Sequence, residues 1–492
     1  MSEVLPLKSD VGGLKSAKVL IMVRVALFVA ALVSVSAGLQ EPRLSDRAEA
    51  AVARSGVSGG RLGILIYSTQ AGAPVYDKDS KKVLRLASNT KLLTTACALA
   101  KLGPGYRYRT NLAWGEGSGD LHVFGAGDPL IGGRLYGDDP IRLFRDAAAR
   151  LKEAGPKEFT GNLVVHPGIF DDVPLNPIWI EERYDQNAWW CAPVGGLSFN
   201  DNCIDLLYEA GPNAGDPAKI TLRPDTKYVT IVNRSTTVRG NPTAPFGFVR
   251  AEGSNRITVN GELKVGTRQR VAWVAIKDPA RYFGTVLKET LEAEGIRVAG
   301  EVVASPSLKF DGRHTELLLA EHSLEEAVGT CNTVSQNLYA EMFLKLLGFR
   351  FRSAGSTAAG IEVVLEFLKS EVGITDVEMV DGSGLARENR ASPESLVKLL
   401  TFMRTHRGGK SFVGSLSVAG ATGTLKDRMA STGGRIRAKT GTITGVSSLS
   451  GYAEAPDGDT YIFSILANGW KNGSPRELQD ALGELMAGWK AQ

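Results

Sequence analysis

The sequence contains few of the residues that bind metal ions. Only four cysteines and five histidines occur among 492 residues, and neither a Cys-x-x-Cys nor a His-Glu-x-x-His motif is present. The histidines are scattered, whereas metal ligands usually recur at short, regular spacings. The sequence therefore predicts no metal site and no cofactor.

A strong excess of one charge is also missing. The formal net charge is +4, and the first 37 residues carry +2 of it. This +2 comes from Lys8, Lys15, Lys18 and Arg24 against Glu3 and Asp10. The rest of the chain carries 4 − 2 = +2, far from the basic excess that polyanion binding requires. We therefore expect no nucleic-acid partner.

A long apolar run, "VALFVAALVSVSA" (25–37), follows the first lysines and ends in small residues. This pattern is typical of a secretory signal peptide. We predict that residues 1–37 are a signal peptide cleaved after about Ala37, with export to the periplasm or cell wall and at most peripheral membrane association. The alternative is an uncleaved anchor starting at Val19, but Arg24 interrupts that run and a charge inside a span is costly.

The cysteines of an exported protein can form disulfides. Cys191 and Cys203 flank the turn-rich stretch "APVGGLSFNDN", which can close a hairpin and makes them the best candidate pair. The alternative is that these two, together with Cys97 and Cys331, are small buried residues. The sequence does not choose between the two interpretations.

The order of strand and helix patterns predicts an α+β fold. The segment 61–77 reads as a strand, a Gly/Pro turn and a second strand, and 88–103 reads as a buried helix ending near Gly103. Helical periodicity returns from 320, and 435–469 reads as strands with a hairpin turn at "APDGD". We expect one antiparallel sheet flanked by helices, built from 38–105 and 320–492. Residues 106–319 are predicted to be a mainly β insertion with one helix, around 280–295.

The stretch "LASNTKLLTT" (86–95) places Ser88 and Lys91 three residues apart at the start of the buried helix. At this spacing both side chains lie on one face, so a lysine of lowered pKa can serve as base for a serine nucleophile. The motif alone is weak, because "SLVK" gives Ser395 and Lys398 the same spacing in an ordinary amphipathic helix. Taken singly, Ser88 and Lys91 are better interpreted as a helix cap and a solvated lysine.

Two further motifs strengthen the case. "SQN" (Ser335 to Asn337) falls in a helical stretch, where a hydroxyl and an amide are expected to project from one turn, and "SFN" (198–200) repeats the pattern in a turn-rich context. "KTGT" (Lys439 to Thr442) occurs once, at the predicted opening of a strand. There Gly441 allows a substrate backbone to approach, and a lysine with threonine hydroxyls can hold a carboxylate.

The order Ser-x-x-Lys, Ser-x-Asn, Lys-Thr-Gly resembles the signature of serine β-lactamases and penicillin-binding proteins. Ser88 and Ser335 are 335 − 88 = 247 residues apart, which resembles the class C low-molecular-mass penicillin-binding proteins, the D-alanyl-D-alanine carboxypeptidase/endopeptidase family. Further segments similar to this family include "GAGDPLI", "DGSGLARENRASP" and "AKTGTITGVSSLSGY". The resemblance implies a serine β-lactamase/transpeptidase-like fold and a serine carboxypeptidase that acts on peptidoglycan stem peptides and is acylated by β-lactams.

The resemblance also implies a role for each motif residue. Ser88 is the expected nucleophile and Lys91 its base, while Ser335 relays a proton to the leaving amine and Asn337 binds the substrate amide. Lys439 is expected to raise the local positive potential and so keep Lys91 deprotonated. Together with Thr440 and Thr442 it is also expected to attract the terminal carboxylate beside Gly441. The backbone N–H groups of Ser88 and Thr442 are expected to hold the oxyanion.

Two alternatives stay open. A noncatalytic wall-binding relative of the same fold would not form an acyl-ester with penicillin. A β-lactamase would turn penicillin over quickly, but a class A enzyme needs a deacylating glutamate between the first motifs, and no helical Ω-loop is evident there. The role of "DGSGLARENR" (381–390) is also open, between support of the fold and a place beside the site.

Overall fold

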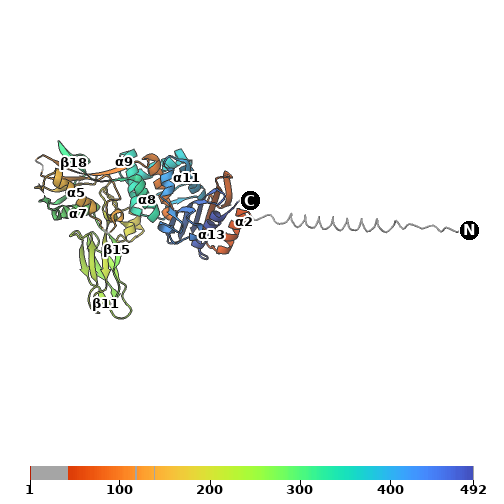
Figure 1. Cartoon of the computed structure of the whole chain (residues 1–492), viewed down its shortest axis with the longest axis horizontal. Helices are drawn as coiled ribbons and strands as arrows, with labels where there is room; N and C mark the ends of the chain where they lie inside the picture. Colours follow the sequence, from red (N-terminus) through yellow and green to blue (C-terminus); the bar gives the residue numbers. More distant parts are fainter. Residues whose placement is uncertain (2–42, 117–118, 138, 491–492) are drawn as a thin grey trace.

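The structure is a computed structural model that describes residues 1, 43–116, 119–137 and 139–490. The predicted signal peptide therefore lies, apart from Met1, outside the described residues. Figure 1 shows that the first and last described segments share one lobe, while the middle of the chain forms a second lobe beside it. In the part of the chain that is described, no helix is long and apolar enough to cross a membrane.

The first lobe is built on a six-stranded sheet. Its order is β2 (Ala73–Lys78), β1 (Arg61–Ser68), β23 (Thr460–Asn468), β22 (Val446–Glu454), β21 (Ile436–Ile443) and β20 (Ser417–Val418). Every neighbouring pair is antiparallel, and β1 joins the two ends of the chain by pairing with β23. The prediction of one antiparallel sheet made from early and late strands is confirmed.

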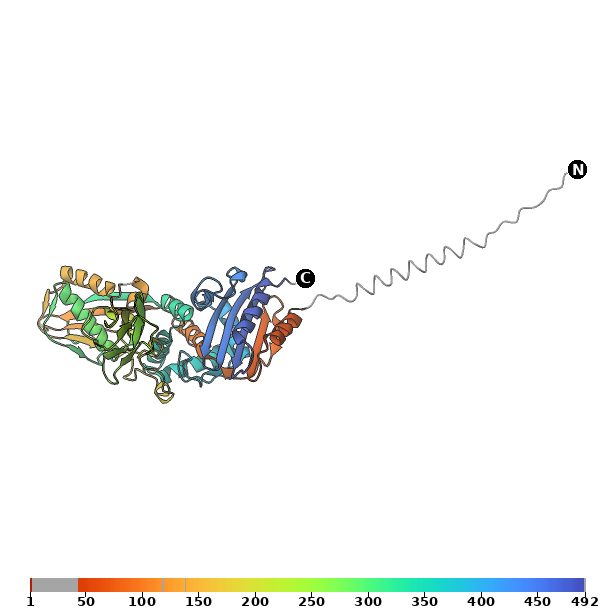
Figure 2. The same ribbon diagram turned by 90° about the horizontal axis from the view of Figure 1, so that it is seen from below.

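Both faces of this sheet are covered. Along β1, Ile64 and Ile66 pack in the cluster with α2 (Leu44–Ser55) and α13 (Pro475–Gly488), whereas Leu65 belongs to the cluster on the opposite face. This alternation follows from the two-residue period of a strand. Figure 2 shows α2 and α13 beside the blue strands. The opposite face carries α3 (Thr90–Lys101), α8 (Leu324–Val334), α9 (Asn337–Arg352), α10 (Thr357–Phe367), α11 (Pro393–Thr405) and α12 (Gly409–Gly414).

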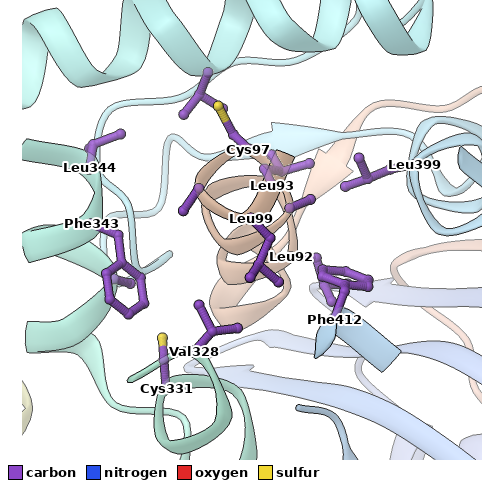
Figure 3. Packing of buried hydrophobic residues seen from close by; sticks show 14 of the residues in the cluster. Leu92, Leu93, Cys97, Leu99, Val328, Cys331, Phe343, Leu344, Leu399 and Phe412 are labelled. Atoms are coloured by element: carbon purple, nitrogen blue, oxygen red, sulfur yellow. The ribbon is translucent and has the colours of Figure 1, made fainter. Parts of the chain in front are cut away.

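Helix α3 is buried almost all round, as its sequence predicts. Every residue from Thr90 to Ala100 is buried. Figure 3 shows Val328, Phe343 and Leu399 from three other helices around it. Gly103 follows the helix with φ 83°, the left-handed conformation expected of a C-terminal glycine. Because α3 is held by packing on all sides, its first turn is a rigid place for a functional group.

The second lobe contains a five-stranded sheet in the order β17 (Val302–Ala304), β7 (Leu163–His166), β5 (Leu121–Phe124), β4 (Arg107–Gly115) and β18 (His314–Ser323). It also contains α7 (Pro279–Ala293), the predicted helix, and α5 (Arg142–Ala154), which the sequence prediction missed. The signal for α5 was present, since Phe144, Ala147, Ala148 and Leu151 recur at helical spacing and are all buried.

Shorter strands complete this lobe. They form the sheet of β15 (Arg270–Ala275), β8 (Cys203–Glu209) and β9 (Lys219–Arg223), the sheet of β10 (Thr230–Asn233), β13 (Arg256–Asn260) and β12 (Gly247–Arg250), and the pairs β11 (Thr236–Val238) with β14 (Glu262–Lys264) and β6 (Glu158–Phe159) with β16 (Arg297–Val298). The short helices are α4 (Gly133–Tyr136) and α6 (Pro177–Glu181), and β3 (Leu84–Arg85) pairs with β19 (Arg390–Ala391) in the first lobe.

The chain passes between the lobes at two adjacent points. Arg107 of β4 pairs with Ser323 of β18, and the Leu324 amide donates to the Tyr106 carbonyl at 2.9 Å. These crossings lie within a few residues of the boundaries predicted at 106 and 319. The division into domains itself stays a prediction.

Cys97, Cys191, Cys203 and Cys331 are all buried and none forms a disulfide, so the interpretation of Cys191 and Cys203 as a disulfide pair is wrong. Cys191 packs with Trp179, Leu385 and Ala386, whereas Cys203 packs in a different cluster. Burial raises the pKa of the Cys191 thiol to about 12, which disfavours the reactive thiolate. The alternative of small buried residues is confirmed.

Candidate active site

Ser88 lies in a single turn of 3₁₀-helix, Ala87–Asn89, that leads directly into α3. Lys91 is fully buried in the first turn of α3, and its Nζ donates to Ser88 Oγ at 3.1 Å. The residue at the cap position of α3 is Asn89, and it makes no side-chain cap bond. Ser88 and Lys91 are therefore not the helix cap and exposed charge of the alternative interpretation.

The Ser-x-Asn motif lies at a break between two helices, so the predicted continuous helix is wrong. Helix α8 ends at Val334, Ser335 adopts a left-handed conformation (φ 63°, ψ 39°), and α9 begins at Asn337. The break turns the two side chains toward different lysines. Ser335 Oγ accepts from Lys439 Nζ at 2.9 Å, and Asn337 Oδ1 accepts from Lys91 Nζ at 2.6 Å.

The sequence had suggested that the Lys-Thr-Gly motif opens a strand. It lies instead inside β21, where Lys439 is the fourth residue, with Ile436 counted as the first. A Cβ atom on Gly441 would lie 2.9 Å from the Ser88 backbone nitrogen and 2.2 Å from Ser448 Oγ. Gly441 is thus required for β21 to approach the Ser88 turn, whatever it does for a substrate. Thr440 Oγ1 donates to Thr424 Oγ1 at 2.8 Å, and Thr442 is exposed.

These motifs face a common cavity of about 530 Å³. Its walls include Ser88, Ser335, Thr440, Gly441 and Thr442. The volume falls in the range of pockets that hold small-molecule ligands. The structure therefore brings Ser88 with its neighbour Lys91, Ser335 and the Lys-Thr-Gly strand to one cleft, although Ser88 and Ser335 are 247 residues apart and Ser335 and Lys439 are 104 residues apart in the sequence.

Both lysines are held in conditions that favour loss of their protons. Burial lowers the pKa of Lys91 to about 8, and the nearby Asp381 and Glu341 carboxylates oppose this shift. Burial, followed by the charge of Lys91, lowers the pKa of Lys439 well below its usual value. A lysine with a pKa near neutral pH can act as a general base, which an exposed lysine cannot do efficiently.

Residues from "DGSGLARENR" also reach the site. The Ser383 carbonyl accepts from Lys91 Nζ at 2.7 Å. Buried Glu341 holds this loop, because its carboxylate accepts from the amides of Gly382 and Ser383 at 2.9 and 2.7 Å. Asp381 accepts from the Gly384 amide at 2.7 Å. The loop thus supports the fold and also lies beside the site, so both open interpretations hold.

The second lobe contributes one contact that sequence reasoning missed. The Trp190 carbonyl accepts from Asn337 Nδ2 at 2.8 Å. This bond fixes the orientation of the Asn337 amide, so that Oδ1 faces Lys91. No motif signals the contact, because any residue can supply a backbone carbonyl.

The two look-alike motifs have ordinary surroundings. Ser395 Oγ donates to Asp376, while Lys398 is half exposed and lies 3.6 Å from Glu394. In the other, Ser198 Oγ donates to the Gly195 carbonyl at 3.0 Å. Within the described ranges, no group of three or more potential ligands is arranged around a metal site.

The model of the D-Ala-D-Ala carboxypeptidase 3 (S13) family matches residues 44–489. The chain belongs to this family. It is 30% identical over 475 residues to the D-alanyl-D-alanine carboxypeptidase of Actinomadura sp. (strain R39), covering 92% of this chain and 86% of the relative. It is 24% identical over 437 residues to D-alanyl-D-alanine carboxypeptidase DacB of Haemophilus influenzae. The match covers 84% of this chain and 87% of that relative.

The fold is similar to that of penicillin binding protein 4 (dacB) from Haemophilus influenzae, with a TM-score of 0.74 and 21% identity over 90% of this chain and 98% of the other. The family membership confirms the resemblance to class C penicillin-binding proteins and the prediction of a serine-type D-Ala-D-Ala carboxypeptidase. The roles of individual residues stay predictions.

Proposed function

We propose that the protein is exported and removes the terminal D-alanine from peptidoglycan stem peptides through an acyl-enzyme on Ser88. The contact of 3.1 Å between Ser88 Oγ and Lys91 Nζ carries this proposal, because it joins a hydroxyl to a base whose pKa burial lowers to about 8. A noncatalytic relative has no need of such a pair.

The reaction proceeds in two steps. Ser88 Oγ attacks the carbonyl carbon of the penultimate D-alanine while its proton passes to Lys91. The C–N bond then breaks, and the leaving amine takes a proton through Ser335, which Lys439 contacts. Water next hydrolyses the ester and restores Ser88. The backbone N–H groups of Ser88 and Thr442 stabilise the oxyanion in both steps.

Substrate is held on both sides of the scissile bond. Asn337 donates one N–H to the Trp190 carbonyl, and its second N–H is the donor for the stem-peptide carbonyl. Lys439, Thr440 and Thr442 attract the terminal carboxylate. Without substrate the Thr440 hydroxyl donates to Thr424 Oγ1, and it turns to that carboxylate when substrate binds. Cross-linked stem peptides are a further proposed substrate.

β-Lactams are proposed covalent inhibitors that acylate Ser88. A solved structure of the Haemophilus influenzae protein, complexed with a novel beta-lactam, shares the fold with a TM-score of 0.68 and 20% identity, covering 89% of this chain and 97% of that one. The direct test is labelling with a fluorescent penicillin together with mass spectrometry of stem pentapeptides before and after incubation. Loss of one D-alanine supports the proposal. Rapid turnover of nitrocefin would instead identify a β-lactamase.

Acylation is expected to depend on pH through Lys91. The base works when neutral, so the rate should fall about tenfold per pH unit below about pH 8 and level off above it. The measurement is the second-order rate of penicillin labelling as a function of pH. An acid limb absent from the parent protein would exclude Lys91 as the titrating base.

Thr440→Val is expected to lower kcat/KM for the carboxypeptidase reaction. The lost transition-state stabilisation should be roughly 1–3 kcal/mol, because a carboxylate oxygen is left without its hydrogen-bond donor. A stem peptide amidated at its C-terminus lacks that charge, so the substitution should affect it much less. The test is a double-mutant-type cycle, in which kcat/KM is measured for the parent and the Thr440→Val protein with the acid and the amidated peptide. It separates the loss caused by the hydroxyl from the loss caused by the carboxylate. Additive losses would mean that Thr440 does not contact the carboxylate.

A further inference from the structure

A second cavity, of about 340 Å³, lies on the second lobe against the residues that flank Ser335. Val334 and Gln336 form one of its walls, while Ser335 itself lines the catalytic cavity. The remaining walls come from the second lobe and include Trp189, Asn200, Asp201, Asp205, Arg223 and Trp273. None of these residues has a part in the proposed reaction.

Two tryptophans give this cavity an aromatic surface. Trp273 of β15 is 53% exposed, which is unusual for so large an apolar side chain. Trp189 is half buried, and the bridge between the neighbouring residues Ala188 and Val274 brings the two segments together. The cavity therefore offers flat indole surface that water can reach.

The polar part of the wall is already ordered. Arg223 Nη2 lies 2.9 Å from Asp205 Oδ2, and Asn200 Nδ2 donates to Asp205 Oδ1 at 3.1 Å. Asp201 Oδ2 accepts from Gln336 Nε2 at 3.0 Å. Two carboxylates against one guanidinium disfavour a phosphate or another strong anion. Because these charges are hydrogen-bonded, the wall suits a neutral ligand rich in hydroxyl and amide groups.

The position of the cavity limits what can reach it from the active site. Gln336 is next to Ser335 in the chain, so the two walls are only about 3.8 Å apart at their Cα atoms. A stem peptide of about four residues spans at most roughly 13–14 Å when extended. Because Val334 and Gln336 line this cavity and Ser335 lines the catalytic one, the two cavities border the same stretch of chain, and the amino sugar is the substrate group beyond the stem peptide.

We propose that this cavity binds an N-acetylated amino sugar of the glycan strand that carries the substrate peptide. This inference rests on the proposed function. The C–H face of the sugar ring packs on Trp273 and Trp189, and its hydroxyl and acetamide groups meet the partly exposed Asn200 and Asp201. The second lobe thus selects stem peptides that are still attached to glycan.

The test compares two soluble substrates, a disaccharide-pentapeptide and the same pentapeptide without sugar, by kcat/KM for D-alanine release. The parent protein should prefer the sugar-bearing substrate through a lower KM. Trp273→Ala should reduce this preference by up to about tenfold, and Trp273→Phe should retain part of it. Turnover of the sugar-free peptide and acylation by penicillin should not change. Val271→Ala is the matched control, since Val271 is exposed on the same face of β15 but does not line the cavity.

Direct binding gives a separate readout. Titration with N,N′-diacetylchitobiose should produce a saturable change in tryptophan fluorescence that Trp273→Ala abolishes. Equal kcat/KM for the two substrates in the parent, or an unchanged preference in Trp273→Ala, would overturn the inference while leaving the proposed function intact. Saturation by a simple diamine in place of chitobiose would also overturn it and identify a cation site. Failure to hydrolyse either substrate would instead overturn the proposed function, and the chitobiose titration would still test the cavity.

Discussion

Ser88→Ala is expected to abolish both penicillin labelling and D-alanine release, with a loss in turnover on the order of 10⁶-fold, the scale seen when a nucleophile is removed. Ser88 carries the hydroxyl that contacts Lys91, the proposed base. The fold should survive, because Ser88 caps no helix and its hydroxyl bonds only to Lys91 Nζ among the described residues. The stability change should stay within about 1 kcal/mol. Intact-protein mass spectrometry after penicillin treatment measures the labelling, and thermal unfolding measures the stability.

Ser395→Ala is the matched control for this variant. It removes the serine of the look-alike motif, whose hydroxyl donates to Asp376, so it should lower stability while labelling remains at Ser88. Equal labelling of Ser88→Ala and the parent protein would show that the acylated residue lies elsewhere.

Lys91→Arg is expected to be nearly as damaging as Lys91→Ala, each lowering the acylation rate by about 10²–10⁴-fold. Arginine keeps the charge but cannot lose a proton near neutral pH. It also does not fit, because Lys91 is fully buried and its Nζ donates to three acceptors, Ser88 Oγ, Asn337 Oδ1 and the Ser383 carbonyl. Stopped-flow or gel-based labelling with a fluorescent penicillin gives the rate.

Lys398→Arg controls for the substitution itself, since Lys398 is half exposed beside Glu394 and should tolerate it without loss of labelling. Substantial acylation of Lys91→Arg would mean that a positive charge alone suffices at this position. The base would then have to be another group that contacts Ser88.

The sequence predicted much of the scaffold because its signals are local. The alternation of Leu62, Ile64 and Ile66 predicted strand β1, and the apolar spacing from Leu92 to Leu99 predicted α3. The same kind of signal existed for α5 and was overlooked. The break at Ser335 was not predictable from periodicity, because the apolar pattern continues across it while one left-handed residue redirects the chain.

The supporting contacts of the site were hidden for a different reason. Ser383 and Trp190 act through backbone carbonyls, so their side-chain identity signals nothing. Glu341 acts through its carboxylate, but the groups it binds are backbone amides of a distant loop, which any residue could supply. The missing disulfide has a related cause. Cys191 and Cys203 are close in sequence, but their side chains pack in two different hydrophobic clusters.

By itself, the sequence determined which groups are available for the chemistry: a Ser-x-x-Lys pair on one helical face, a Ser-x-Asn and a Lys-Thr-Gly, in an order that resembles one enzyme family. Residue type and spacing along a helix are enough for that. Only the tertiary structure decided that the three motifs share one cleft, that Lys91 is buried deeply enough to lower its pKa to about 8, and that the second lobe reaches the site through Trp190. Burial and long-range contacts depend on how distant segments pack, and a local sequence pattern carries no information about the partner segment.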